Sequence, residues 1–216
     1  MSDVPPNALR ALEELADVSR ETLPEVIEAL SHYLALLSKW QPKINLVSSA
    51  SLAEVWTRHV VDSAQLWPLL PAGTKTITDL GSGAGFPGLV LAILGKGQEG
   101  FKVHLVESDG RKCAFLREVI RATGAPAEVH NKRIEALAPW PSDVVTARAL
   151  ASLGKLLPLA APFLSDGGIA LFLKGKSAKS ELTAARDWGT FEVEVTPSRT
   201  DPEAAVIKLS RLSPAP

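Results

Sequence analysis

Cysteine, methionine and tyrosine each occur only once in this chain of 216 residues. The lone thiol, Cys113, excludes an intrachain disulfide and favours a reducing compartment. No apolar run is long enough to cross a bilayer, and the N-terminus lacks the basic and apolar segments of a secretory signal. We therefore expect a cytoplasmic protein with no membrane segment.

Patterns of metal ligands and of catalytic triads are also missing. The four histidines are scattered along the chain, and no group of histidines, cysteines and carboxylates has the spacing of a metal site. No serine–histidine–aspartate or cysteine–histidine arrangement stands out. We expect a monomer that binds no metal.

Charge is nearly balanced, with a formal net charge of −1, but it is unevenly distributed. Residues 1–30 carry seven acidic side chains against two arginines, which leaves 21 basic and 17 acidic residues in the remainder. The mildly basic charge of residues 31–216 is compatible with a polyanionic partner but does not identify one.

The stretch from Asp79 to Gly88 (DLGSGAGFPG) is the most informative in the chain. It follows a β-branched run and precedes the apolar run Leu89–Leu94, so it predicts a strand, a glycine loop and a helix. Gly81, Gly83 and the two later glycines allow positive φ and a close approach of the backbone to a ligand. The alternating glycines after Asp79 resemble the S-adenosylmethionine loop of class I methyltransferases, because a carboxylate suits a ligand with cationic groups.

Two other interpretations of this loop remain open. Gly83–Gly88 also fits the dinucleotide pattern G-x-G-x-x-G, which would indicate an NAD-dependent oxidoreductase. A pyrophosphate would, however, be repelled by Asp79. The third interpretation is a tight turn that binds no ligand, although one or two glycines would make such a turn.

The apolar pattern divides the chain near residue 72. Residues 1–72 predict a helical extension and 73–216 a cofactor-binding domain in which strands and helices alternate. The helices expected in the extension are Ala8–Val18, a second from the capping box Thr22–Glu25 to Trp40, and a third over about Ser51–Leu70.

The second region predicts a mostly parallel sheet with helices on both faces. The expected strands are 76–81, 101–107, 127–131, 143–149 and 168–174, and the expected helices are 87–95, 111–123, 133–138, 152–164 and 177–188. Phe191–Val195 and Ala205–Leu209 have no helix between them, so they should pair as an antiparallel hairpin. This α/β layout is typical of the seven-stranded class I methyltransferase fold.

Polar residues at the expected strand ends are the candidate site residues, because ligands bind at the carboxyl edge of such sheets. Glu107 lies 24 residues after Gly83, where an acid can accept hydrogen bonds from two ribose hydroxyls. The turn Asn131–Glu135 would lie beside the adenine, or would simply start a helix with Glu135 near its positive end. Arg148 needs an anionic partner: the cofactor's carboxylate, Asp79, or an RNA phosphate.

A lysine-rich segment follows the fifth expected strand. Lys174, Lys176 and Lys179 surround a glycine at the expected rim of the pocket, where they would suit an RNA phosphate. A solvated run of charge is the alternative interpretation of this segment. Arg148 and Lys174 are the candidates for direct roles in the reaction.

Together these stretches resemble the bacterial 16S ribosomal RNA guanine-N7 methyltransferase family, also called glucose-inhibited division protein B. The resemblance covers about residues 30–211. Its motifs are Asn45-Leu46-Val47, Arg58-His59-Val60-Val61-Asp62-Ser63, Asp79 to Gly88, Arg133-Ile134-Glu135, Ala147-Arg148-Ala149 and Leu173-Lys174-Gly175.

The resemblance implies a class I fold behind a small helical extension, S-adenosyl-L-methionine as methyl donor, and a guanine in the 530 loop of 16S rRNA as target. It also places cofactor contacts on Gly81, Phe86, Ile134, Glu135 and Arg148, with Glu107 and Ser108 near the ribose and adenine. The family often has Glu-Arg-His where this chain has Glu203-Ala204-Ala205, so a basic RNA contact there would have to come from Arg199 or Arg211. A non-catalytic RNA-binding protein on the same scaffold is a further alternative.

Overall fold

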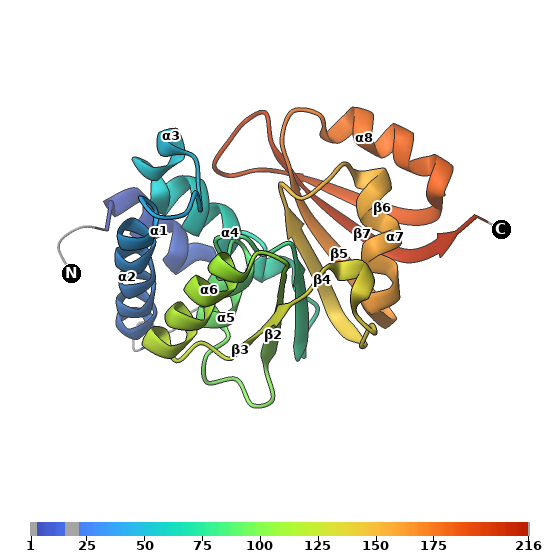
Figure 1. The fold of residues 1–216 in the computed structure, drawn as a ribbon. Helices are drawn as coiled ribbons and strands as arrows, with labels where there is room; N and C mark the ends of the chain where they lie inside the picture. Colours follow the sequence, from blue (N-terminus) through green and yellow to red (C-terminus); the bar gives the residue numbers. More distant parts are fainter. Residues whose placement is uncertain (1–3, 16–21, 216) are drawn as a thin grey trace.

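The computed structural model describes residues 4–15 and 22–215, which are organised around one seven-stranded sheet. The strand order is β3-β2-β1-β4-β5-β7-β6; the pairs from β3 to β5 are parallel, and β7 runs antiparallel to both β5 and β6 (Figure 1). The strands are β1 (Thr76–Leu80), β2 (Lys102–Glu107), β3 (Ala127–Asn131), β4 (Ser142–Arg148), β5 (Leu164–Lys174), β6 (Gly189–Pro197) and β7 (Ala205–Pro214). The predicted fold class and its C-terminal hairpin are confirmed.

Helices cover both faces of the sheet, as the ribbon shows (Figure 1). One hydrophobic cluster joins a face of the sheet to α1 (Pro6–Leu15), α2 (Leu23–Trp40), α5 (Gly88–Leu94) and α6 (Gly110–Thr123). A second cluster joins the opposite face to α7 (Leu153–Ala160) and α8 (Ala178–Ala185). The first cluster includes residues on both sides of residue 72, and the division into 1–72 and 73–216 stays a prediction.

The prediction of one α-helix over about Ser51–Leu70 is wrong. The chain instead forms α3 (Ser49–Leu52), a π-helical turn η1 (Trp56–Val61), α4 (Asp62–Ala64) and a 3₁₀ turn η2 (Trp67–Leu69). Pro68 has no N–H to donate and so favours the short 3₁₀ turn. π-Turns are rare and are found often at functional sites.

Two other expected features differ in detail. The helix expected at 133–138 is only a 3₁₀ turn, η3 (Ile134–Ala136), and Pro139 disfavours helical geometry at Ala138 directly before it. The capping box at Thr22 does not form a side-chain cap. The expected end of the first helix at Val18 lies outside the described residues.

Two predicted helices end early in short turns. The two turns are η4 (Ala161–Phe163), which follows α7, and η5 (Arg186–Trp188), which follows α8.

In the part of the chain that the structure describes, no helix combines the length and apolarity needed to cross a bilayer.

Candidate functional site

A cavity of about 800 Å³ lies at the carboxyl ends of β1, β2 and β4, within the size range of small-molecule sites. Most of the predicted cofactor residues lie on its wall. They are Gly81, Gly83, Phe86, Glu107, Ser108, Ile134, Glu135 and Arg148. The structure therefore brings together predicted residues from four separate stretches of the chain.

The glycine loop forms one side of this cavity, and its backbone geometry requires glycine, as Gly81 and Gly83 illustrate. Gly81 has φ +67°, and a Cβ there would lie 2.6 Å from Leu150 Cδ1. Gly83 has φ +55°, and the nearest atom to a Cβ would be the Gly81 carbonyl oxygen, at 3.7 Å. A side chain at residue 83 would therefore extend into the cavity.

Glu107 fixes the loop to the adjacent strand. Its Oε2 accepts a hydrogen bond from the Gly83 N–H (2.9 Å) and its Oε1 accepts one from the Asp109 N–H (2.8 Å). The Asn131 side-chain amide donates to the carbonyl oxygens of Glu107 (3.2 Å) and Ser108 (3.0 Å). The carboxylate is thus held in a defined position on the cavity wall, and its contact with a ribose stays a prediction.

Asp79 is the predicted cofactor residue that does not reach the wall of this cavity. Its side chain is fully buried behind the loop, where Oδ1 accepts a hydrogen bond from Thr146 Oγ1 (2.8 Å). Burial raises the pKa of Asp79 to about 6, against the effect of the Thr146 hydrogen bond. Oδ2 makes no hydrogen bond within residues 4–15 and 22–215, and a Cβ at Gly88 would lie 2.7 Å from it. A direct cofactor contact by Asp79 stays a prediction, and its visible role is to pack against the start of α5.

Comparisons with known proteins identify the family of this chain. Residues 26–201 match the GidB family model, described as rRNA small subunit methyltransferase G. The chain belongs to this family. The resemblance that the sequence motifs indicated is thereby confirmed, together with the S-adenosyl-L-methionine-dependent methyltransferase class.

Two relatives illustrate the similarity. The ribosomal RNA small subunit methyltransferase G of Rhodospirillum centenum is 60% identical over 197 residues, which are 91% of this chain and 88% of that protein. The corresponding protein of Parvibaculum lavamentivorans is 54% identical over 200 residues, 92% of this chain and 87% of the relative.

Solved structures are similar in fold at low sequence identity. A SAM-dependent methyltransferase from Aquifex aeolicus has a TM-score of 0.52 at 17% identity, covering 69% of this chain and 88% of the other. A SAM-dependent O-methyltransferase from Thermotoga maritima has a TM-score of 0.53 at 14% identity, covering 72% and 66%. Both support the class I architecture.

A second cavity of about 750 Å³ adjoins the first. The two share Leu46 and the segment Arg148–Ala151, so Arg148 lies where they meet. Lys174 lies on the wall of the second cavity, whereas the glycine loop does not. This methyltransferase therefore has one compartment beside the glycine loop and another beyond Arg148.

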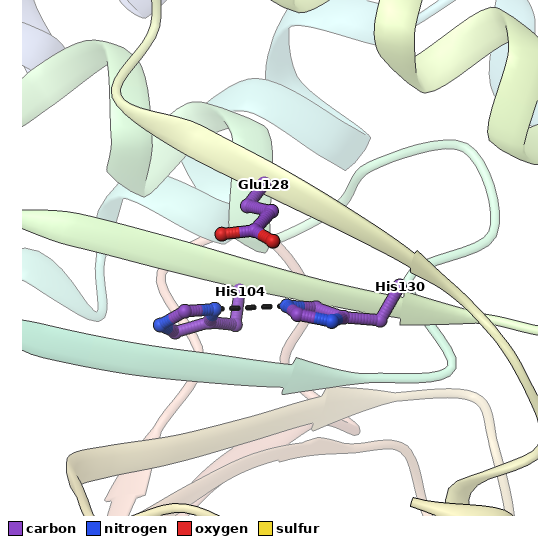
Figure 2. Close-up of side chains that lie close together, drawn as sticks. All are labelled: His104, Glu128 and His130. Carbon is purple, nitrogen blue, oxygen red and sulfur yellow. Dashed lines mark hydrogen bonds between the residues drawn. The ribbon is translucent and has the colours of Figure 1, made fainter.

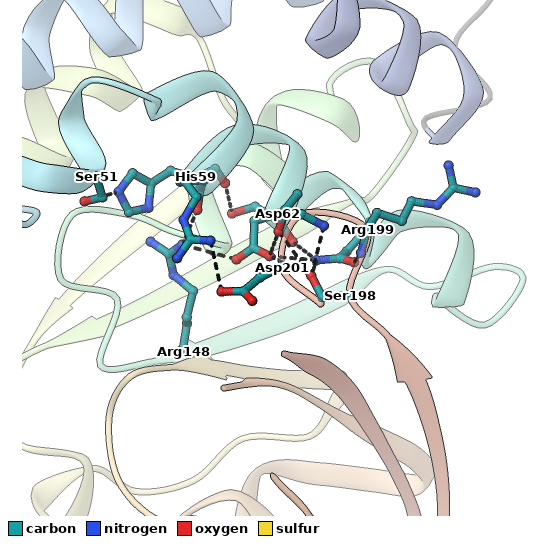
Figure 3. Close-up of polar contacts among 11 residues, drawn as sticks. Ser51, His59, Asp62, Arg148, Ser198, Arg199 and Asp201 are labelled. Atoms are coloured by element: carbon teal, nitrogen blue, oxygen red, sulfur yellow. Dashed lines mark hydrogen bonds and ion pairs between the residues drawn. The ribbon is translucent and has the colours of Figure 1, made fainter. Parts of the chain in front are cut away.

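Arg148 is held by the π-helical turn and the residue after it. Its Nη1 donates to the Arg58 carbonyl oxygen (3.2 Å) and pairs with Asp62 Oδ2 (3.4 Å), as Figure 3 shows. Its Cζ lies 5.1 Å from the centre of the Phe86 ring. The partner is thus Asp62, which is not among the partners considered from the sequence.

Asp62 in turn connects Arg148 to the β6–β7 connection. Its Oδ1 accepts hydrogen bonds from Thr200 Oγ1 (2.7 Å) and Gln65 Nε2 (2.8 Å). Arg58 forms an ion pair with Asp201 in the same connection, at 2.9 Å. The motif Arg58–Ser63 was visible in the sequence as a resemblance only, because no local pattern predicts contacts with residues 200 and 201.

His59 is a second site residue that the sequence left without a role. Its ring stacks on Phe86 with centroids 4.8 Å apart, and its Nε2 makes a hydrogen bond to Ser51 Oγ (2.9 Å). Burial, reinforced by the charge of Arg148, lowers the pKa of His59 to about 3. His59 is therefore neutral at physiological pH and lines the second cavity without adding charge.

Lys174 does not form the exposed patch with Lys176 and Lys179 that the sequence predicted. Its side chain is buried and forms an ion pair with Glu181 (2.9 Å), and it also donates to the Ala151 carbonyl oxygen. It thereby ties α8 to the segment after β4. Lys176 and Lys179 are exposed, so the expected patch is reduced to these two lysines.

Proposed function

We propose that this protein transfers the methyl group of S-adenosyl-L-methionine to N7 of a guanine in the 530 loop of 16S ribosomal RNA. The observation that carries the proposal is the cavity lined by the glycine loop and Glu107, which meets a second cavity at Arg148. The names of relatives with 60% and 54% identity support ribosomal RNA of the small subunit as the substrate class.

The residues of the site suit a reaction that needs orientation more than proton transfer. When bound, S-adenosyl-L-methionine supplies a methyl group activated by its sulfonium. Guanine N7 carries an in-plane lone pair and attacks without losing a proton, so no general base is required. Holding N7 in line with the methyl group is then the main task, and orientation contributes several kcal/mol to such reactions. Arg148, fixed between the two cavities, is positioned for that task.

The other interpretations have less support. The glycine loop and Glu107 would also fit a dinucleotide, but the family match does not favour an oxidoreductase. A non-catalytic RNA-binding protein would have no physical need for a loop whose Gly83 leaves room for a ligand beside Glu107.

The proposed function is tested by mapping 16S rRNA by mass spectrometry from cells with and without this protein. We expect one guanine of the 530 loop to lose 7-methylation without the protein and to regain it on complementation. Purified protein should also methylate small-subunit rRNA with labelled S-adenosyl-L-methionine. Unchanged methylation in the deletion strain would contradict the proposal.

Glu107→Gln should weaken binding of S-adenosyl-L-methionine. An amide keeps the size of the side chain but accepts hydrogen bonds less well from ribose hydroxyls and from the Gly83 N–H, at about 1.5–3 kcal/mol for a bond to a charged group. Calorimetry should show a loss of roughly tenfold or more. Glu99→Gln, at an exposed acid, is the control, and an equal loss in both variants would contradict the role of Glu107.

Replacing Lys176 and Lys179 together by alanine should weaken binding of 16S rRNA and leave the affinity for the cofactor unchanged. Both side chains are exposed beside the second cavity, so they can neutralise phosphates. The slope of log affinity against log salt should become shallower by about one to two units. Lys39 and Lys43, exposed near the end of α2, form the control pair, and an unchanged slope would identify the lysine segment as a solvated surface.

A further inference from the structure

A cluster of possible metal ligands lies on the sheet away from both cavities. His104 is on β2, and Glu128 and His130 are on β3 (Figure 2). Because His104 is opposite Glu128 in the strand register and His130 is two residues further on, all three side chains lie on one face of the sheet. A ligand atom of each lies within 4.8 Å of those of the other two. His104 Nδ1 and His130 Nε2 are 2.9 Å apart and share a hydrogen bond.

The connection from β3 to β4 leaves this part of the sheet without a helix. It contains only the 3₁₀ turn η3, and the covering side chain is Trp140. The Trp140 ring centre lies 5.0 Å from that of His104 and 4.5 Å from that of His130. Its Nε1 donates to Thr78 Oγ1 (2.9 Å). The imidazoles are therefore held in place on one side, while Glu128 is exposed to solvent on the other.

We propose that His104, Glu128 and His130 bind one divalent transition-metal ion, for which Zn²⁺ is the best-suited candidate. Two imidazoles and one carboxylate, completed by water, are a donor set that zinc prefers. Zinc–nitrogen bonds of about 2.0–2.1 Å in tetrahedral geometry place two ligand nitrogens about 3.3–3.4 Å apart. The facing nitrogens would have to separate by roughly half an ångström.

The groups around the cluster set the conditions for binding. One of the two facing nitrogens carries the proton of the hydrogen bond, so that imidazole must move its proton to the other ring nitrogen before both can ligate. Lys102 pairs with Glu128 Oε2 at 2.6 Å and competes with a cation for this carboxylate. Glu128 can present its other oxygen, Oε1, to the ion.

The position of the cluster gives the ion a structural role. β3 is one of the two edge strands of the sheet, and Lys132 and Arg133 immediately after it line the first cavity. An ion bound to both β2 and β3 would fasten the edge strand to its neighbour. Because the ion binds the folded state, it should stabilise the protein in proportion to its concentration and affinity.

The test is a titration of the full, chelator-treated chain with ZnCl₂ by calorimetry and by thermal unfolding. We expect one site and a rise in Tm. His130→Gln should lower the affinity at least 100-fold and Glu128→Gln about tenfold. His32→Gln, at an exposed histidine on α2, should change neither quantity. Lys102→Met should tighten binding a few-fold, because it removes the competing cation.

Two results would overturn the proposal. One is the absence of a Zn²⁺-dependent rise in Tm in the wild-type protein. The other is an affinity that Glu128→Gln and Lys102→Met leave unchanged, since both residues are exposed and these variants should fold. Co²⁺ provides a further check, because a tetrahedral site gives visible absorption bands that His130→Gln should abolish. None of these measurements depends on methyl transfer.

Discussion

Gly83→Val is expected to abolish binding of S-adenosyl-L-methionine and to leave the fold intact. The backbone at residue 83 has φ +55°, and a Cβ built there meets only the Gly81 carbonyl oxygen, at 3.7 Å. The branched side chain would therefore occupy the cavity beside Glu107 instead of clashing with the protein. We expect an affinity loss of at least 100-fold by calorimetry, equivalent to about 2.7 kcal/mol.

The backbone strain of this variant needs its own control. A valine in the left-handed region costs about 1–2 kcal/mol wherever it occurs. Gly73 has φ +79°, has no atom within 4 Å of a built Cβ, and lies outside both cavities, so Gly73→Val carries the same kind of strain without the obstruction. The two variants should lose similar amounts of Tm, and only Gly83→Val should lose the cofactor. Unchanged affinity in folded Gly83→Val would show that the loop does not contact the ligand.

The architecture of the sheet was predictable from the sequence because its signals are local. β1, β2, β4 and β5 are each followed by a turn and an α-helix, so these connections follow directly, whereas β3 is followed only by η3. The hairpin of β6 and β7 was predictable because the two strand patterns are separated only by residues 196–204, which are mostly polar or turn-forming and leave no room for a helix. The insertion of β7 between β5 and β6 was not, since it depends on pairing over long distances.

The residues on the wall of the first cavity were predictable for a related reason. Residues that end parallel strands meet at one edge of the sheet, so Gly81, Glu107 and Ile134 had to converge if the strands were placed correctly. Asp79 differs from them because side chains alternate along a strand and its carboxylate turns into the core toward Thr146.

The residues that form the second cavity were harder to predict from the sequence. The segment 51–70 has an apolar stripe that suits one long helix, and that pattern does not reveal the π-helical turn that directs His59 and Asp62 toward Arg148. Asp62 and Arg148 are 86 residues apart, and no periodicity connects them. The same holds for His104 and His130, which are scattered in the chain but face each other across paired strands.

Arg148→Lys is expected to keep most of the stability and to lose most of the activity. The guanidinium contacts the Arg58 carbonyl oxygen, pairs with Asp62 and lies over the Phe86 ring at the same time. An ammonium preserves the charge but cannot reproduce that planar, many-donor geometry. We expect methyl transfer to fall about 10- to 100-fold, or 1.4–2.7 kcal/mol in the barrier.

The Arg148→Ala variant and a matched arginine separate this role from a purely structural one. Arg148→Ala removes the ion pair, but Asp62 keeps its hydrogen bonds from Thr200 and Gln65, so the stability cost should stay near 1.5–3 kcal/mol. Arg186 also lies over a phenylalanine ring, that of Phe191, and donates to its carbonyl oxygen, but it lies outside both cavities. Arg186→Lys should therefore resemble Arg148→Lys in Tm and retain full turnover. If Arg148→Lys also retained full turnover, its contacts would serve only to hold the π-helical turn against the sheet.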